Sequence, residues 1–148
     1  MAPNTHFGWG TLNNGNTFKY NLNPMKKTIL VVDDFASIRD FVCETLQRKG
    51  YETYGAANGN QAYQLLADKP EVNLVLTDYN MPDCTGFELL KKIKSNPDIS
   101  RVPVVFLTTE SSPDKMKAAK EAGLSAWIKK PYRAETFFAQ IENAITNG

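Results

Sequence analysis

Histidine and cysteine, from which many catalytic and metal centres are built, are nearly absent from this sequence. His6 is the single histidine, which leaves almost nothing for a histidine metal site or a Ser-His-Asp triad, and we regard it as a tail residue. Cys43 and Cys84 are the only cysteines; they lack metal-ligand spacing and fall on different predicted elements. We therefore expect a reduced pair of thiols in a cytoplasmic protein.

Excess charge and long apolar runs are missing as well. The 17 basic and 16 acidic residues leave a net charge of +1, which provides no electrostatic footprint for nucleic acid or an anionic membrane surface. No apolar run approaches the roughly 20 residues of a membrane-spanning helix. We expect no nucleic-acid partner and no membrane insertion. The 148 residues are enough for one domain with a proper core.

The first 24 residues differ in composition from all that follows. They hold six asparagines, three glycines, one lysine and no acidic residue, which is typical of turn-rich sequence. They lack the basic region followed by an apolar region that marks a signal peptide. Because Met25 and the "KKTILVVDD" after it resemble a natural start, we expect residues 1–24 to be a polar extension, a leader or an alternative start, ahead of a domain at 25–148.

From Thr28 onward, strand and helix patterns alternate five times. The predicted strands are 28–33, 51–56, 72–78, 102–108 and 125–129. The predicted helices are 35–49, 60–67, a stretch striped by Phe87, Leu90 and Ile93, 113–122 and 134–146. This alternation predicts right-handed βαβ units, and hence a doubly wound α/β fold with a five-stranded parallel sheet covered on both faces.

Local signals refine these helices. Ile38, Phe41, Val42 and Leu46 recur at helical spacing within helix 35–49, which Gly50 should end. Ser112 and Pro113 are a good N-cap and first-turn pair for helix 113–122, which Gly123 should end. The lysines at 91, 92 and 94 are expected on the solvated face of their helix.

Polar residues stand at the ends of four predicted strands: Asp33 with Asp34, Asp78, Thr108 and Lys130. Parallel strands deliver their carboxyl ends to one edge of the sheet, so these groups should converge where the strand order reverses. Three carboxylates in one crevice repel each other unless a cation holds them, and Mg²⁺ suits an oxygen-only site that keeps waters for a phosphate. One carboxylate could then attack phosphorus while Lys130 and Thr108 bind the phosphoryl oxygens.

Five segments carry a resemblance to a known family: "VVDDFASIR", "AANGNQAY", "LVLTDYNMPDCTGFELL", "VVFLTTE" and "WIKKPY". Together they resemble the receiver domain of two-component response regulators, over residues 27–146 and without a large insertion. With no output domain after the last helix, the chain is most similar to the single-domain chemotaxis regulators of the CheY type. The resemblance implies a flavodoxin-like, three-layer α/β/α fold with strand order 2-1-3-4-5.

The resemblance also implies a role for each residue of the acidic site. Asp78 matches the family's phospho-accepting aspartate, and Asp33 and Asp34 match its acidic pair. Asp34 and Asp78 would bind Mg²⁺ directly, together with the backbone carbonyl of Asn80.

Further positions match the family's switch and hydrolysis residues. Thr108 matches the switch hydroxyl, Lys130 the phosphate-binding lysine, and Lys130–Pro131 the family's cis peptide bond. Trp127 falls at the switch aromatic, where the family often has tyrosine or phenylalanine. Asn80 and Glu110 flank the path of the hydrolytic water and should tune dephosphorylation.

The function implied is switching. A histidine kinase would phosphorylate Asp78, and the surface of helix 113–122, strand 125–129 and helix 134–146 would change shape and bind an output target. A phosphatase can shorten the signal. Beyond self-phosphorylation and slow autodephosphorylation, we expect no enzymatic turnover. The pathway is either chemotaxis or that of another single-domain receiver, such as a phosphorelay intermediate.

Three other classes of protein compete with this interpretation. A Mg²⁺-dependent phosphatase of the haloacid-dehalogenase type needs a second acid two residues after its nucleophile, and here Asp78 is followed by Tyr79 and Asn80. A flavodoxin-like cofactor binder needs a glycine-rich phosphate loop, which does not follow strand 28–33. A degenerate receiver used only for docking would not need the complete set of site residues.

Several residues also have purely structural interpretations. Asp34 is a possible N-cap of the helix that begins at Phe35, and Asp78 a possible turn former. Thr108 is common at strand ends, Lys129 is expected in solvent, and Cys84 is expected to fill space in its loop. Taken singly, these interpretations compete well. Their joint occurrence at four strand ends favours the site.

Overall fold

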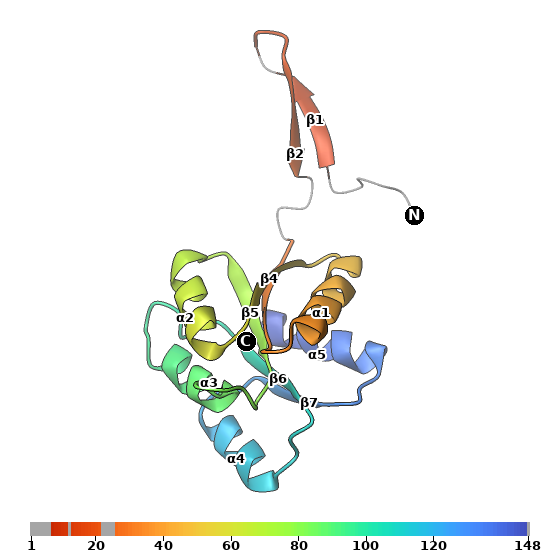
Figure 1. The fold of residues 1–148 in the computed structure, drawn as a ribbon. Helices are drawn as coiled ribbons and strands as arrows, with labels where there is room; N and C mark the ends of the chain where they lie inside the picture. The colour runs from red at the N-terminus through yellow and green to blue at the C-terminus, as the bar shows by residue number, and fades with distance from the viewer. Residues whose placement is uncertain (1–6, 12, 22–25, 148) are drawn as a thin grey trace.

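The computed structural model describes residues 7–11, 13–21 and 26–147. His6 and Met25, on which two of the predictions above depend, lie outside these ranges. Five parallel strands form the main sheet, in the order β4-β3-β5-β6-β7 (Figure 1). They are β3 (Thr28–Val32), β4 (Glu52–Ala56), β5 (Val72–Thr77), β6 (Val104–Thr108) and β7 (Ala126–Lys129). Numbered within the sheet, the order is 2-1-3-4-5, which confirms the predicted topology.

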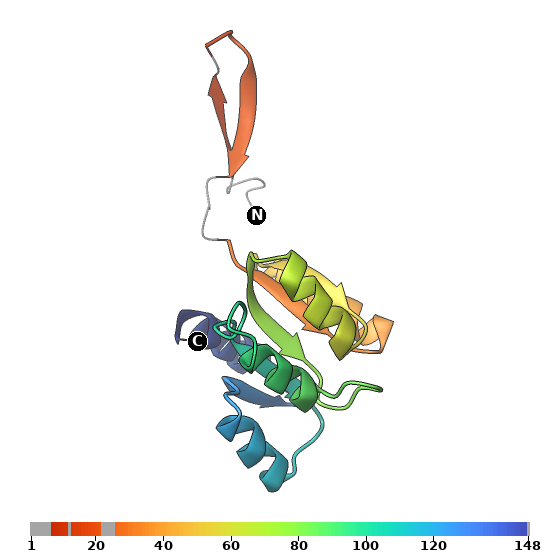
Figure 2. The ribbon, with the colours of Figure 1, turned by 90° about the vertical axis from the view of Figure 1, so that its left-hand side faces the viewer.

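Five helices cover the two faces of this sheet: α1 (Ala36–Arg48), α2 (Gly59–Asp68), α3 (Gly86–Lys94), α4 (Pro113–Glu121) and α5 (Ala134–Asn147). Figures 1 and 2 show the three layers. Side chains of α1 and α5, among them Leu46 and Phe137, pack on one face. Side chains of α2, α3 and α4, among them Leu66 and Leu90, pack on the other. Because both faces are buried, the central strands are continuous apolar runs rather than alternating ones.

The helix boundaries follow from local chemistry. The Asn58 side chain accepts from the Gln61 amide at the start of α2, and Thr85 with Glu88 forms a capping box on α3. Ser112 caps α4 with Pro113 in its first turn, as predicted. Gly50 and Gly123, with φ of 105° and 103°, follow α1 and α4 in the left-handed conformation that favours glycine.

A two-stranded antiparallel hairpin, β1 (Phe7–Thr11) and β2 (Thr17–Asn21), precedes the α/β unit. In Figures 1 and 2 it projects away from that unit. The composition of residues 1–24 predicted only turn-rich sequence here. The signal for a hairpin was Asn14-Gly15 between two short runs, and Gly15 has a φ of 87°.

The inner face of α1 is narrower than its apolar residues suggest. Val42 and Leu46 are buried, but Ile38 is 37% exposed and Phe41 59% exposed, so only two of the four residues at helical spacing face the core. Phe41 lies one residue, about 100° around the helix, from Val42. Ile38 shares the stripe of Val42 but stands in the first turn, at the edge of the sheet.

Lys94 is another departure. Lys91 and Lys92 are exposed as predicted, but Lys94 is half-buried, and its ammonium donates to the carbonyls of Ser100 at 2.9 Å and Val102 at 3.1 Å. Burial lowers the pKa of Lys94. Its place on the solvated face was wrong because the loop before β6 folds back over the end of α3.

The contrast between two phenylalanines tests the assignment of the core. Phe137 on α5 is fully buried, so Phe137→Ala should lower the free energy of unfolding by about 3–5 kcal/mol. Phe41→Ala removes an exposed side chain and should change it by about 0.5 kcal/mol or less. Urea unfolding followed by circular dichroism measures both. Equal losses would contradict the orientation of α1.

Within the described ranges, no helix combines the length and apolar character that crossing a bilayer requires.

Cys43 and Cys84 are both free thiols, and burial raises the pKa of each. Cys84 is buried in the loop after β5, as expected for a residue that fills space.

Candidate functional site

Three carboxylates meet at the carboxyl edge of the sheet. β3 and β5 are neighbours with Val32 opposite Thr77, so the residues that follow each strand emerge side by side. Carboxylate oxygens of Asp33, Asp34 and Asp78 all lie within 4.8 Å of one another. The convergence predicted from the strand ends is therefore confirmed for these residues.

Asp33 is the most deeply placed of the three and is 5% exposed. Its amide donates to the Ala56 carbonyl at 3.1 Å, and its Oδ1 accepts from the Phe35 amide at 2.9 Å. Burial is the largest cause that raises its pKa, and the neighbouring charge of Asp78 raises it further. Ionisation of Asp33 is thus less favourable than that of an ordinary aspartate.

Asp34 carries the clearest sign of an unfilled bonding requirement. Its Oδ1 is buried and finds no hydrogen-bond partner among the described residues. The N-cap residue of α1 is Phe35, with no capping side chain in the described structure, so the interpretation of Asp34 as a helix cap was wrong. A buried, unpaired carboxylate oxygen within an all-oxygen acidic cluster fits a hard divalent cation such as Mg²⁺.

Asp78 is held by its own loop. Its amide donates to the Val32 carbonyl at 3.1 Å, and its Oδ1 accepts from the Tyr79 amide at 2.7 Å. Gly86, at the start of α3, lies so close that an added Cβ would collide with the Asp78 carbonyl. The half-exposed Asp78 carboxylate therefore reaches the cluster from a loop that these contacts hold in place. Asn80, two residues on, is exposed in the same loop.

Thr108 is the last residue of β6, and Lys130 directly follows the neighbouring strand β7. Thr108 is fully buried, and its hydroxyl accepts from the Glu110 amide at 3.1 Å. The Lys130 amide donates to the Thr108 carbonyl at 2.9 Å. The positive charge of Lys130 lowers the pKa of Asp33, against the larger effect of burial, which raises it. The Lys130–Pro131 bond is cis, as the resemblance implied, and Lys129 is exposed.

Trp127 is half-buried in an aromatic cluster beside the site. Its ring centroid lies 5.4 Å from that of Phe106 and 5.6 Å from that of Tyr79, which follows Asp78 directly. Its indole N–H donates to the Glu110 carbonyl at 3.1 Å. The indole thus contacts residues from both the β5 and β6 ends of the site.

The Glu110 carboxylate faces α4. One oxygen accepts from the Lys115 ammonium at 2.9 Å, and the other from the amides of Ser111 and Ser112, each at 3.2 Å. The Lys115 hydrogen bond is the largest cause that lowers the pKa of Glu110. The Lys115 ammonium also lies 5.2 Å from the centre of the Tyr79 ring.

Sequence reasoning overlooked three residues of this region: Arg39, Tyr79 and Lys115. Arg39 donates from Nη1 to the main-chain oxygen of Asp33 at 2.7 Å. All three stand within or near the motifs that carried the resemblance. Residue type alone did not distinguish them from ordinary surface groups, because each acts through a contact with a different element.

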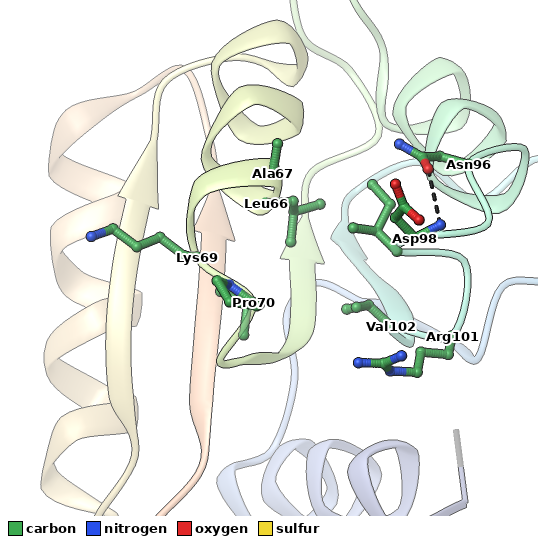
Figure 3. Close-up of a pocket in the computed structure, with 10 residues that line it drawn as sticks. Leu66, Ala67, Lys69, Pro70, Asn96, Asp98, Arg101 and Val102 are labelled. Atoms are coloured by element: carbon green, nitrogen blue, oxygen red, sulfur yellow. Dashed lines mark hydrogen bonds between the residues drawn. The ribbon is translucent and has the colours of Figure 1, made fainter.

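A separate hollow of about 230 Å³ lies near the amino end of β5, the end opposite Asp78 (Figure 3). Its walls come from the end of α2 and the loop before β6. Asn96 accepts there from the Asp98 amide at 3.0 Å, as the dashed line shows. It shares no residue with the acidic cluster, which remains the candidate site.

Fold and site together define a protein class: a doubly wound sheet with an acidic cluster at the carboxyl ends of β3 and β5 and a lysine directly after β7. Residues 29–142 match the response regulator receiver domain, and the chain belongs to that family. Its receiver domain is of the kind found in CheY-like single-domain response regulators.

Two relatives illustrate this. The chemotaxis protein CheY homolog of Campylobacter jejuni is 31% identical over 121 residues, which are 81% of this chain and 93% of that protein. The two-component response regulator ORR7 of Oryza sativa is 33% identical over 105 residues, 71% of this chain but 50% of that protein. Among solved structures, the chemotaxis protein CheY4 of Vibrio cholerae matches with a TM-score of 0.74 and 36% identity, over 80% of this chain and 98% of that one.

Proposed function

We propose that this chain is a stand-alone response regulator of a chemotaxis pathway, phosphorylated on Asp78 by a histidine kinase in a Mg²⁺-dependent reaction. The observation that carries the proposal is the meeting of Asp33, Asp34 and Asp78 within 4.8 Å, with a buried and unpaired oxygen on Asp34. The CheY relatives support the assignment to chemotaxis.

In this proposal each residue has a defined task. Asp33, Asp34, Asp78 and the Asn80 carbonyl hold Mg²⁺, which when bound neutralises charge on the phosphoryl oxygens. An oxygen of Asp78 forms a bond to phosphorus as the bond from phosphorus to the donor's imidazole nitrogen breaks, and that nitrogen keeps the electron pair. The Lys130 ammonium binds the transferred group as a point charge.

The signal follows from the new charge. Phosphorylation gives Asp78 a charge near −2 and three strong acceptors, to which the Thr108 hydroxyl can donate. As the Thr108 side chain moves toward the phosphoryl group, its hydroxyl leaves the Glu110 amide, and Trp127, whose indole N–H donates to the Glu110 carbonyl, turns inward. The relative populations of the two conformations of the surface formed by α4, β7 and α5 consequently change.

That surface is suited to an output target. It carries a hollow of about 380 Å³ lined by Met116, Leu124 and Trp127 among others. A target that binds one shape of this hollow better than the other reads the phosphorylation state. We place the protein in the cytoplasm, with a histidine kinase, this target and a phosphatase as partners and no catalytic turnover of a diffusing substrate.

A second candidate keeps the chemistry and changes the pathway. The match to rice response regulators favours a receiver outside chemotaxis, such as a phosphorelay intermediate. Transfer of the phosphoryl group from Asp78 onward to a histidine-containing protein would identify the relay. Binding of the phosphorylated form to a target without onward transfer would identify the regulator.

The deciding experiment is activation by a small phosphodonor or by a mimic of the phosphoryl group. Acetyl phosphate or beryllofluoride, with and without Mg²⁺, should change Trp127 fluorescence only when the ion is present. Because Trp9 also emits, the measurement belongs in a Trp9→Phe background. A response that does not need Mg²⁺, or that survives Asp78→Asn, would contradict the proposal.

The lifetime of the phosphorylated state should depend on Asn80 and Glu110. Asn80→Asp adds a charge beside the acyl phosphate, and Glu110→Ala removes a carboxylate from the loop after Thr108. We expect each to change the hydrolysis rate by about threefold or more, a barrier change of at least ~0.6 kcal/mol. Phosphorylation of Asp78 itself should remain. Equal decay rates in the variants and the unmodified chain would exclude this tuning role.

A further inference from the structure

Arg39, in the first turn of α1, holds the chain segment that carries the acidic pair. Its guanidinium Nη1 donates to the main-chain oxygen of Asp33 at 2.7 Å. Its own amide donates to the main-chain oxygen of Phe35 at 2.9 Å. One residue therefore binds both ends of the three-residue segment with Asp34 at its centre.

The arm of Arg39 reaches Asp33 across β4, where a glycine makes room for it. A Cβ added to Gly55 would lie 3.2 Å from Cδ and 3.4 Å from Nε of Arg39. The next residue, Ala56, accepts the Asp33 amide at 3.1 Å. The acidic pair is thus supported by α1 and β4 together, and the Arg39 side chain lies between them.

The kind of acceptor that Arg39 uses is informative. A guanidinium commonly binds carboxylates, and bound to Asp33 or Asp34 in that way it would compete with a cation. Here it binds a main-chain carbonyl, which leaves the carboxylate oxygens available, including the buried and unpaired Oδ1 of Asp34. Among the described residues, Oδ1 of Asp34 has no hydrogen-bond partner, so the main chain holds this carboxylate in place.

We propose that Arg39 is a positioning residue for the metal site: its guanidinium fixes the main chain of Asp33 and so keeps the acidic pair oriented toward a shared cation. The inference rests on the proposed Mg²⁺ site. It adds a residue that touches neither the ion nor the phosphoryl group. Supporting groups of this kind commonly affect metal affinity about 10- to 100-fold.

The test measures Mg²⁺ affinity of the full chain by isothermal titration calorimetry at neutral pH. Arg39→Met keeps the aliphatic arm over Gly55 but removes the donor, and should weaken binding about tenfold. Arg39→Lys keeps a charged donor and should restore part of the loss. Arg48→Met removes an exposed arginine from the last turn of the same helix and should leave the affinity unchanged.

Gly55→Ala provides an independent approach to the same contact. Its methyl group must displace the Arg39 arm by a few tenths of an ångström, which lengthens the bond to Asp33. Gly55→Ala alone should weaken Mg²⁺ binding about threefold. Added to Arg39→Met it should cause no further loss, because the two changes act on one contact. Additive losses would overturn the proposed coupling.

Unfolding in the presence of a chelator shows that each variant is folded. If Arg39→Met binds Mg²⁺ as the unmodified chain does, or if Arg48→Met weakens binding equally, the inference is overturned while the metal site stands. If the unmodified chain binds no Mg²⁺, or Asp34→Asn leaves its binding unchanged, the proposed function fails first and the role of Arg39 with it.

Discussion

Replacement of Asp78 by asparagine should abolish phosphorylation by acetyl phosphate, with a loss of ~100-fold or more, because an uncharged amide is a poor nucleophile toward phosphorus. The geometry makes this residue hard to replace. Asp78 leaves β5 on a loop fixed by bonds to Val32 and Tyr79, whereas Asp33 is buried and uses Oδ1 to accept the Phe35 amide. Intact mass spectrometry after incubation with the donor and Mg²⁺ measures the effect.

Asp83→Asn is a matched control for this prediction. It makes the same chemical change five residues further along the same loop, at an exposed position with a φ of 69°. Asparagine tolerates this left-handed conformation, so the variant should fold and be phosphorylated normally. Phosphoryl incorporation into Asp78→Asn at the rate of the control would exclude Asp78 as the acceptor.

Loss of one carboxylate from the acidic cluster should have opposite effects on metal binding and on stability. Asp34→Asn should weaken Mg²⁺ binding by ~100-fold, because a charged oxygen ligand is lost from an all-oxygen site. In ion-free buffer the same change relieves repulsion among three carboxylates within 4.8 Å, and should raise the free energy of unfolding by about 1 kcal/mol. Titration calorimetry and urea unfolding in a chelator measure the two effects.

The exposed Asp40 of α1 offers the control. Asp40→Asn makes the same change four residues before Glu44 on the solvent side of the helix, and should leave both quantities unchanged.

Acid should also weaken Mg²⁺ binding, because the ion requires ionised carboxylates. The pKa of Asp33 is raised above its ordinary value of 3.8, so this loss should begin at a higher pH than for an ordinary aspartate. Unchanged affinity in Asp34→Asn would remove this residue from the site.

The contacts that support the site have consequences for engineering it. Arg39 and Gly55 lie on α1 and β4, outside the surface of α4, β7 and α5 that we propose for the output target. Substitutions there should alter metal affinity with little effect on partner docking. Lys115 and Trp127, in contrast, join the site to α4 and β7, so changes there affect the output surface directly.

The periodicity of the sequence by itself determined the layers, the parallel sheet and the edge at which Asp33, Asp34 and Asp78 meet. This was possible because burial on each element repeats with the period of that element, and parallel strands end on one side. The resemblance then supplied the roles we expect of Thr108 and Lys130, and it predicted the cis bond before Pro131.

Only the tertiary structure decided which side chains contact atoms of another element and which remain exposed. The bond from Arg39 to the Asp33 carbonyl, the ammonium of Lys94 on the loop before β6 and the exposure of Phe41 all depend on how far one element stands from the next. Residue type records a side chain's chemistry and its face on its own helix or strand. It does not record the distance to an acceptor on another element, which packing of the whole chain sets.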